Sequence, residues 1–537
     1  MRLITSRLQR RLAADEGFSM ILVVMVMIAT GMFVAAGFAA ANGDLPISRD
    51  SQDRKSAYAA AESGVNFYQF HLNADNDYWL KCDDAPRPNA TEANPVSQPW
   101  DGVGARPWRN VAGSDAQYVI ELIPAAGRTA CENDSAESMI DPTNGTFRIR
   151  VTGRPNAAST LRRTLNATFR RTGFLDYLYF THWETQDPAA YTTQTLRDAA
   201  NLNCNKTRSQ RPSSCVEIQF PSTDSLNGPL HTNDDSVMVC GTPTFGRNPG
   251  DKLEVAGTTD DDGWVQNAGC SGTPILSGPF RLGAETLTMP PDNQSLKAVA
   301  ASGGLLLFGK STIEFQAGGG MKVWNAQAGF NGEVRPLPAN GVIYNDKLSS
   351  CTNTTSPLQA TYGETEGCAK TYVSGQYTGN LTVASADDII VKPNAAPVPD
   401  PEAWSLPDAG LTRNGDYVLG LVAANYVRVY HKVSSSDCER NEAAMKNVTI
   451  EAAILSVKHS FIVDRHNCGE RLGTLNVKGA IGQYYRGPVG QSGTTPNGYS
   501  KNYNYDDRLR YRTPPYFLNP VEVKWKTMRI NEQLPAR

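Results

Sequence analysis

The sequence lacks a surplus of either charge and contains few histidines. Its 537 residues carry 51 Lys and Arg against 54 Asp and Glu, which gives a formal net charge of -3. We therefore expect no nucleic-acid partner, because phosphate binding requires a basic face or stripe. Only six histidines occur, and no two stand at HxxxH or HxH spacing, which argues against a zinc hydrolase. We expect no catalytic residue, no cofactor and no enzymatic activity.

Cysteine is absent from the first 81 residues and never occurs as CxxC. The rest of the chain contains ten cysteines, an even number, which favours disulfides formed in an oxidising compartment after export. Sequence alone leaves the connectivity open. Pairing of neighbours along the chain gives these candidates: Cys82 with Cys131, Cys204 with Cys215, Cys240 with Cys270, Cys351 with Cys368, and Cys438 with Cys468.

One long uncharged run, from Phe18 to Ala41, follows four arginines near the N-terminus. As a helix its 24 residues would reach roughly 36 Å, enough to cross a hydrocarbon core of about 30 Å. The preceding arginines predict a cytoplasmic N-terminus, with everything after Asp44 outside. A secretory signal peptide would have a shorter apolar run followed by its cleavage site. An uncleaved signal anchor remains an alternative.

The residues at the start of this run form a motif. Asp15-Glu16 precede Gly17-Phe18-Ser19-Met20-Ile21, which resembles the prepilin peptidase site of type IV pilins. The resemblance implies cleavage after Gly17 and methylation of the new N-terminal Phe18. Pilins that build the filament body carry Glu at the fifth mature position, where this chain has Leu22. This departure favours a minor, initiating or accessory role over that of a major filament subunit.

A second motif follows in the expected order. The segment Ala57 to Val65, with the sequence AYAAAESGV, resembles the Ala-Ala-Glu-Ala-Gly signature of the PilX-type pilus assembly family. In that family the anchor and this segment form one spine helix. The combined resemblance covers only about residues 15–70. It implies that Glu62 contacts a neighbouring pilin, although a helix-surface glutamate without such a role is the alternative. Small residues spaced by four, which would let anchor helices pack closely, are Gly31, Ala35 and Ala39.

The chain divides by pattern into an anchor region and two β-rich regions. Short alternating runs after the spine predict an antiparallel sheet packed on the helix. Five segments are expected: a prepilin-like leader (1–17), a transmembrane anchor (18–41), an amphipathic continuation of the spine helix (42–79), an α+β pilin-like head (80–172), and a large disulfide-containing β domain outside the cytoplasm (173–537).

The large domain repeats short apolar strands separated by Gly, Ala or Asn corners, as in Leu381-Thr382-Val383 followed by Ile389-Ile390-Val391. The interval between units drifts, so the repeat suggests a solenoid without proving one. The fold class predicted is mainly β with one long N-terminal transmembrane and spine helix and a C-terminal parallel β-helix-like solenoid. A β-sandwich is the alternative.

Only weak chemical signals occur in this domain. Asp260 and Asp262 stand in an Asp-Asp-Asp-Gly segment and are weak calcium candidates, since clustered carboxylates suit that cation, but Asp-Gly is first of all a turn signal. His231 with Asp234 and Asp235 could form an acid–base group, although a surface turn is the simpler interpretation.

The leading hypothesis is a structural component of a type IV pilus-like system, held in the cell membrane by a single pass, with most of the chain at the cell surface. Its expected partners are the membrane, prepilin peptidase, other pilin-like subunits and surface glycans. The alternative is an anchored β-helix enzyme or binding protein that acts on cell-wall or extracellular glycans. A third hypothesis is a membrane-tethered protein that never enters a pilus machine.

Overall fold

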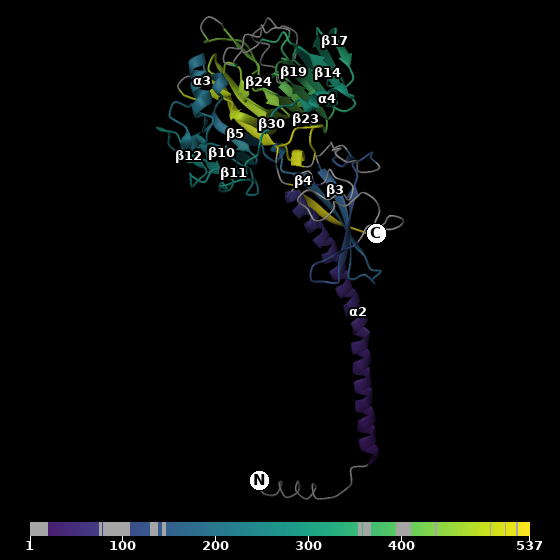
Figure 1. The fold of residues 1–537 in the computed structure, drawn as a ribbon. Helices are drawn as coiled ribbons and strands as arrows, with labels where there is room; N and C mark the ends of the chain where they lie inside the picture. The colour runs from purple at the N-terminus through teal and green to yellow at the C-terminus, as the bar shows by residue number, and fades with distance from the viewer. Residues whose placement is uncertain are drawn as a thin grey trace, which may run out of the picture.

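A long helix carries a small head and a larger β domain in the computed structural model (Figure 1). The predicted leader, with Gly17 and Phe18, lies outside the described residues, as do Cys82 and Cys131. The residues that the structure describes are 20–74, 78, 108–128, 138–141, 146–352, 357, 367–393, 410–434, 438–493, 496–510, 512–521 and 525–536.

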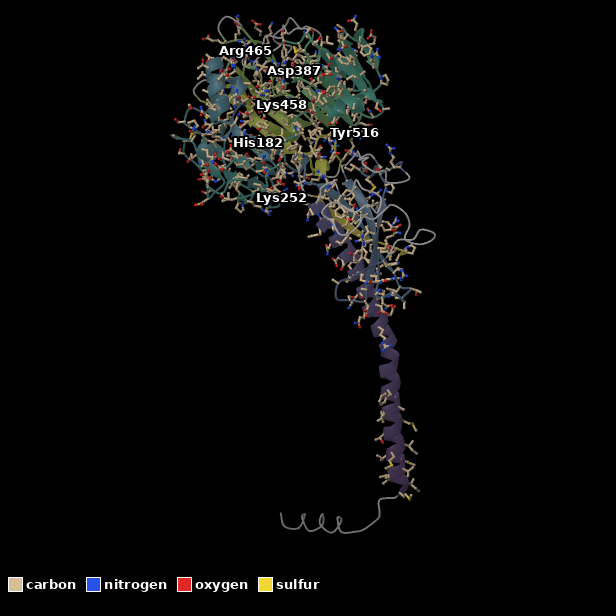
Figure 2. All side chains as sticks on the ribbon, in the orientation of Figure 1. His182, Lys252, Asp387, Lys458, Arg465 and Tyr516 are labelled. Atoms are coloured by element: carbon tan, nitrogen blue, oxygen red, sulfur yellow. A yellow bond between two sulfur atoms is a disulfide. The ribbon has the colours of Figure 1, made fainter. Side chains whose placement is uncertain are left out.

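The helix α2, Met20–Ala74, has 55 residues, which at 1.5 Å each amounts to about 82 Å. Its first part, Met20–Phe38, has a mean hydropathy of 2.5 and is exposed throughout. Within the described residues this is the one helical stretch that is long and apolar enough to cross a membrane. No other described element lies beside this part of the helix (Figure 2). The anchor and spine segments thus share a single helix.

The head is a five-stranded antiparallel sheet against which the second half of α2 packs. Its order is β1 (Arg109–Asn110), β2 (Gln117–Ile123), β3 (Thr146–Arg154), β4 (Arg163–Arg171) and β33 (Trp525–Gln533). The helix contributes side chains at helical spacing to the core between them. These buried residues are Ala57, Ala60, Ala61, Val65, Tyr68 and Leu72.

Glycine allows α2 to lie directly on β3. A Cβ at Gly153 would stand 2.5 Å from the backbone nitrogen of Ala61 and nearer still to the carbonyl oxygen of Ala57. On the helix side, a Cβ at Gly64 would stand 2.5 Å from Cγ1 of Val151. Real side chains do not tolerate such contacts, so helix and strand keep this separation only while both positions lack a Cβ.

The last strand of the head comes from the far end of the chain. β33 pairs antiparallel with β4, and Trp525 packs edge-on against Phe147 with ring centroids 4.7 Å apart. Gln69 of α2 donates a hydrogen bond to the carbonyl oxygen of Trp525 at 2.5 Å. The sequence pattern placed this segment in the large domain, and that assignment is wrong for β33. Its side chains after Trp525 are mostly exposed, so they give no alternating burial pattern.

The large domain is built from ladders of parallel strands, with antiparallel hairpins inserted between them. The first ladder runs in the order β14 (Leu305–Phe308), β18 (Val342–Asp346), β20 (Leu381–Ser385), β23 (Leu419–Ala423), β28 (Ala453–Ser456), β30 (Arg471–Arg486), β5 (Tyr179–Gln186), β8 (Leu230–Thr232) and β11 (Leu253–Val255).

A second ladder accompanies the first. Its order is β15 (Ser311–Phe315), β19 (Thr371–Tyr377), β22 (Gly410–Arg413), β27 (Thr449–Ile450), β30, β32 (Asn497–Tyr505), β7 (Ser225–Asn227), β10 (Thr244–Phe245) and β13 (Ile275–Leu276). A shorter run joins β19 to β21 (Ile389–Val391), β24 (Val427–Val429) and β29 (Phe461–Val463). The ladders confirm the β-rich prediction. Their parallel pairing disagrees with the sandwich alternative, whose sheets are antiparallel.

The order of strands in space differs from their order in sequence. The chain enters the stack at β5 and continues outward through β8 and β11. It then passes through α4 (Ser295–Ala301) to the opposite end of the two ladders. From there successive strands run back from β14 to β30 and β32. There β30 pairs with β5, and β32 pairs with β7. We call these two pairings the seam; in Figure 1 the blue β5 lies beside the yellow-green β30.

Residues that pair between neighbouring strands of the ladder show why the sequence has no fixed repeat length. Thr382, Gly420, Ala453 and Ala480 are successive partners along the first ladder, and the interval between them shortens at each step. One of these intervals holds a hairpin of β25 (His431–Val433) and β26 (Asn441–Ala444), which pair only with each other among the described strands. Insertions of different length therefore separate strands that are equivalent in the ladder.

Four disulfides join the described cysteines, and each links neighbours along the chain. They close loops with sequence separations of 11, 30, 17 and 30 residues. All four lie within the large domain, so each one holds a local loop rather than joining distant parts of the stack. The bonds are Cys204–Cys215, Cys240–Cys270, Cys351–Cys368 and Cys438–Cys468.

The substitution Gly153→Val should weaken the head, because its side chain must push α2 away from β3. We expect the free energy of opening of the β3 amides to fall by about 1–3 kcal/mol, the usual cost of overpacking. Hydrogen exchange measured by mass spectrometry on the full chain in detergent would report it. Gly250→Val is the control, since a Cβ there meets no atom within 4 Å. An equal loss of protection in both variants would contradict the close-packing argument.

Candidate functional site: the anchor helix and a polar groove

The apolar half of α2 presents its side chains without a partner from the described part of the chain. Leu22 is 49% exposed, and a Cβ added at Gly31 would meet no atom within 4 Å. Ala35 is also exposed, while nothing is described of the Ala39 side chain. Gly31 and Ala35, four residues apart, share one face of the helix by its periodicity. Packing of these residues against another helix stays a prediction.

The Ala57–Val65 motif divides between two faces of α2. Ala57, Ala61 and Gly64 face β3, where the short helix–strand distance requires small residues. Glu62 points away from this contact and is exposed. The small residues of the motif therefore have a packing role inside this chain. The role of Glu62 toward a neighbouring subunit stays a prediction.

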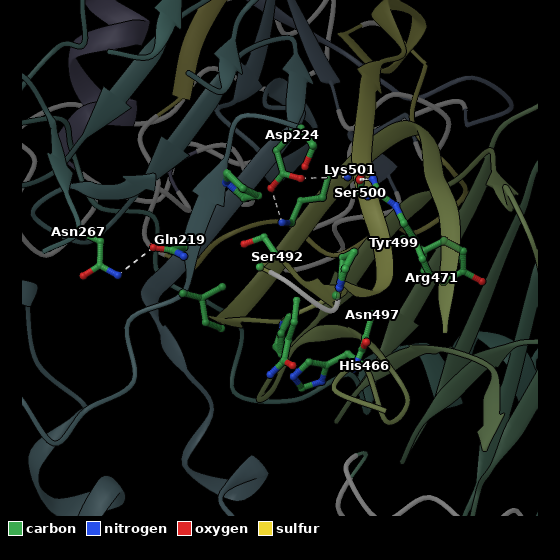
Figure 3. Close-up of a pocket in the computed structure, with 18 of the residues that line it drawn as sticks. Gln219, Asp224, Asn267, His466, Arg471, Ser492, Asn497, Tyr499, Ser500 and Lys501 are labelled. Carbon is green, nitrogen blue, oxygen red and sulfur yellow. Dashed lines mark hydrogen bonds and ion pairs between the residues drawn. The ribbon is translucent and has the colours of Figure 1, made fainter. Parts of the chain in front are cut away.

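A groove of about 600 Å³ lies beside the seam, where loops from several levels meet (Figure 3). It is lined by β6 (Gln219–Pro221) and its flanking residues, by β31 (Gly490–Gln491) and by the start of β32. These segments are far apart in the sequence, so no local sequence motif indicates the groove. Side chains that line it include Glu217, Gln219, Asp224, Asn267, His466, Arg471, Gln491, Ser492, Asn497, Tyr499, Ser500 and Lys501.

Both carboxylates in the described lining of the groove are held by a cation. Arg211 donates two hydrogen bonds to Glu217, at 2.5 Å and 2.9 Å. The Lys501 ammonium lies 2.5 Å from Oδ2 of Asp224. General acid–base catalysis by a carboxylate pair needs one group free to donate a proton and the other free to accept one. Burial raises the pKa of Glu217, although Arg211 opposes the effect, so ion pairing alone does not decide between binding and catalysis at this groove.

Amide and hydroxyl groups, together with Arg471 and His466, form the rest of the polar lining. Asn267 donates a hydrogen bond to Gln219 Oε1 at 2.8 Å, and Arg471 donates one to Ser500 Oγ at 2.7 Å. These pairs fix the orientation of side chains that can both donate and accept hydrogen bonds. Such side chains can bind a polar ligand through hydrogen bonds.

A nucleophile activated by histidine is not found in the described groove. Ser492 is exposed on the loop after β31, and the strand β32 follows that loop, whereas a nucleophile elbow leads into a helix. His466 is 7% exposed, and burial lowers its pKa to about 4. Its Nδ1 has no hydrogen-bond partner within the part of the chain described. The imidazole is therefore neutral at physiological pH.

The structure joins His231 to a carboxylate that the sequence did not suggest. His231 Nδ1 lies 3.5 Å from Oε2 of Glu254, which is its partner on the next strand of the ladder. Although burial opposes the effect, hydrogen bonds from His231 and Tyr177 lower the pKa of Glu254 to about 2. Asp234 instead binds Arg211 at 2.6 Å. Different partners hold these side chains, which gives no support to one acid–base group. His231, Asp234 and Asp235 are 1%, 0% and 6% exposed, so the simpler interpretation as a surface turn is wrong.

The calcium candidates lie in a turn. Gly263, with φ of 69°, donates a hydrogen bond to the carbonyl oxygen of Asp260 at 3.0 Å. Arg208 Nη2 lies 2.9 Å and 2.7 Å from the two carboxylate oxygens of Asp260, and Asp262 is exposed. A calcium ion would have to displace this arginine. The assignment stays a prediction without a structural argument in its favour.

Comparison with known proteins gives little further information. No protein-family model matches the chain, and no curated protein matches it. Among solved structures, the competence-associated pilin ComZ from Thermus thermophilus is 11% identical, in an alignment that covers 90% of this chain and 98% of that chain. The TM-score is 0.26, which is too low to establish a common fold. Any argument for function therefore rests on the residues of this chain.

One buried and one partly buried histidine should make stability depend on pH in opposite directions. The pKa of His466 is lowered from 6.5 to about 4, so the unfolded chain binds a proton there that the folded chain does not. This contribution to stability is present above pH 6.5 and is lost as the pH falls toward 4. At His459, burial is outweighed by Asp187, 2.7 Å away, which raises the pKa. That contribution is present in acid and is lost as the pH rises through the raised pKa.

We expect His466→Gln to flatten the fall in unfolding free energy between pH 6.5 and 4 by up to about 3 kcal/mol. The matched variant His459→Gln should make the same fall steeper, because it removes a contribution that is present in acid. Urea unfolding of the full chain at several pH values measures both slopes. Identical pH profiles for the two variants would contradict the assignment of opposite shifts.

Proposed function

We propose that this protein is a non-enzymatic, minor pilin-like subunit of a type IV pilus-like system, which displays its large β domain at the cell surface. The observation that carries the proposal is the construction of α2. Its first part is apolar and exposed over Met20–Phe38, and the same helix continues into the core of the head. A helix of this kind can pack in a membrane or among similar helices while it carries a folded domain outside.

The N-terminal motif supports entry into the pilin pathway. In this proposal prepilin peptidase cleaves between Gly17 and Phe18, and the arginines before the cleavage site hold the leader in the cytoplasm. The mature chain then crosses the membrane once, with the head and the large domain outside. The exposed face with Gly31 and Ala35 would meet other pilin-like helices, because small residues let backbones approach closely.

The residue at the fifth mature position supports a minor role. A glutamate buried in lipid is costly unless it is paired, so in a filament subunit it would favour assembly with a neighbour. Leu22 enters the membrane without that cost and provides no such contact. The chain would therefore join an assembly at its tip or start rather than repeat along a filament.

The displayed domain, in this proposal, is a parallel β-helix-like solenoid. Successive levels add one strand to each ladder, and apolar side chains such as Val383, Leu421 and Ile454 lie buried one above another in the register. Such a coil accepts hairpins and loops at its corners without loss of its core, which allows a large surface on a regular frame.

A second proposal concerns the groove beside the seam. Its amide and hydroxyl lining supports binding of a neutral surface glycan, because such side chains form hydrogen bonds with a polar ligand. Glycan binding at this place would give the displayed domain an adhesive function.

Processing is the decisive test of the leading proposal. In a host that contains a prepilin peptidase, N-terminal sequencing of the chain should find N-methylated Phe18 as its first residue. Gly17→Ala should keep the whole leader, because the cleavage site is lost. Gly31→Ala, a glycine substitution inside the apolar helix, should still be processed. A wild-type chain that begins at Met1 would overturn the pilin assignment, and one that begins beyond Ala41 would indicate secretion.

Binding to soluble neutral oligosaccharides from cell-wall and capsular glycans tests the groove. We expect Gln219→Leu to weaken binding by at least about tenfold, which corresponds to the loss of about 1.4 kcal/mol, because it removes a lining amide and its pair with Asn267. Asp261→Asn, an exposed change on another loop, should leave the affinity unchanged. Appearance of shortened glycans during the measurement would favour the enzyme alternative.

A further inference from the structure

Two oppositely charged side chains meet inside the seam. Asp224 immediately precedes β7, and Lys501 lies in β32, which pairs with β7 through Asn502 and Ser225. The two residues are separated by 277 positions in the sequence. Figure 3 shows the Lys501 side chain directed at the Asp224 carboxylate.

The reacting atoms of an amide bond are already close together. Lys501 Nζ lies 2.5 Å from Oδ2 of Asp224, and the backbone N–H of Lys501 donates a hydrogen bond to Oδ1 at 3.1 Å. Because a C–O bond measures about 1.2 Å, the carboxyl carbon is no more than about 3.7 Å from Nζ. Bond formation in oriented pairs begins from about 3–3.5 Å. The backbone hydrogen bond also fixes which carboxylate oxygen faces the amine.

Both side chains are largely buried at the edge of the groove, and the surroundings disfavour the charged amine. The side chains of Lys501 and Asp224 are 8% and 1% exposed. The Phe220 ring centroid lies 5.4 Å from Lys501 Nζ and 3.3 Å from Cζ of Arg486. Burial lowers the pKa of Lys501, and although the Asp224 carboxylate opposes this effect, the charge of Arg486 adds to it. Burial and Arg486 thus both favour the neutral amine, which is the nucleophilic form.

A second buried pair provides the contrast within the same molecule. Lys370 Nζ lies 2.6 Å from Asp388 and 3.1 Å from Asp387, and Arg428 lies 2.9 Å from Asp388. Although burial opposes both effects, the two carboxylates raise the pKa of Lys370, and the two cations lower the pKa of Asp388. This pair stays ionised. Similar distances thus occur with opposite shifts of the lysine pKa.

We propose that Lys501 and Asp224 form an intramolecular isopeptide bond across the seam. The ammonium first transfers a proton to the carboxylate, which gives an amine and a carboxylic acid. The Nζ lone pair attacks Cγ and forms a C–N bond, and one C–O bond of the acid breaks. The departing hydroxyl takes a proton from the nitrogen and leaves as water. The step consumes no oxidant, reductant or other reactant, and its products are one amide and one water molecule.

The position of this bond would stabilise the domain more than the position of any described disulfide does. Each described disulfide closes a local loop, with the largest sequence separation being 30. The isopeptide bond would join the first levels of the domain to the last ones, over 277 residues. A cross-link that closes so long a loop removes more freedom from the unfolded chain than one that closes a short loop.

The mass of the wild-type chain tests the proposal directly. The full-length protein is purified in detergent, reduced and alkylated, and its intact mass is compared with that of the processed sequence. We expect a deficit of one water molecule, a missing tryptic cleavage after Lys501, and a branched peptide that contains both Lys501 and Asp224. A wild-type chain of full mass, with the two residues in separate unmodified peptides, would overturn the proposal.

Two variants locate the cross-link. Lys501→Arg keeps a cation beside Asp224 but removes the amine, so the chain should regain the mass of one water molecule. Lys370→Arg, at the contrasting pair, should keep the deficit. A water loss that persists in Lys501→Arg would place the dehydration elsewhere and overturn the assignment. The wild-type measurement decides the question even where a variant folds poorly.

Discussion

The contact between α2 and β3 joins the membrane-compatible part of this protein to everything else. At Gly153 the sheet has no side chain, and at Ala57, Ala61 and Gly64 the helix has almost none, so the two backbones lie against each other. Close-packed interiors have low compressibility and transmit strain. A force applied to the apolar half of the helix would therefore act on the head as on a rigid body. Longer side chains at this contact would separate the two backbones, and the helix and the head would then no longer move as one rigid body.

The large domain combines a uniform apolar interior with charges buried between its levels. Arg428 lies between Asp388 and Asp464, and Arg486 binds Glu184, with every one of these side chains almost completely buried. Buried ion pairs contribute little to stability, but an unpaired member is costly. Their partners come from different levels of the ladders. A stack shifted by one level would separate them, so we interpret these pairs as fixing the register rather than strengthening the fold.

The sequence predicted those features that depend on a short segment or on composition. The apolar run at Phe18–Ala41, the alternation in β3 and the export signal in the cysteines each reside in a short segment or in composition. The seam has no such signal, because it pairs strands that are far apart in the sequence, as with Tyr179 of β5 and Ile481 of β30. Glu254 was missed for the same reason: it reaches His231 from a neighbouring level. β33 shows one buried side chain, Trp525, which is too little for a periodic pattern.

The return of β33 to the head has a consequence for the timing of biogenesis. β4 receives its outer neighbour only when residues 525–533 have emerged, and the core around Phe147 lacks Trp525 until then. A chain delivered across a membrane from its N-terminus would thus hold an incomplete head while the whole large domain passes. Full attachment of the head to its helix would coincide with the end of transport, and a truncated chain would carry the defect at its base, close to the membrane, rather than at its tip.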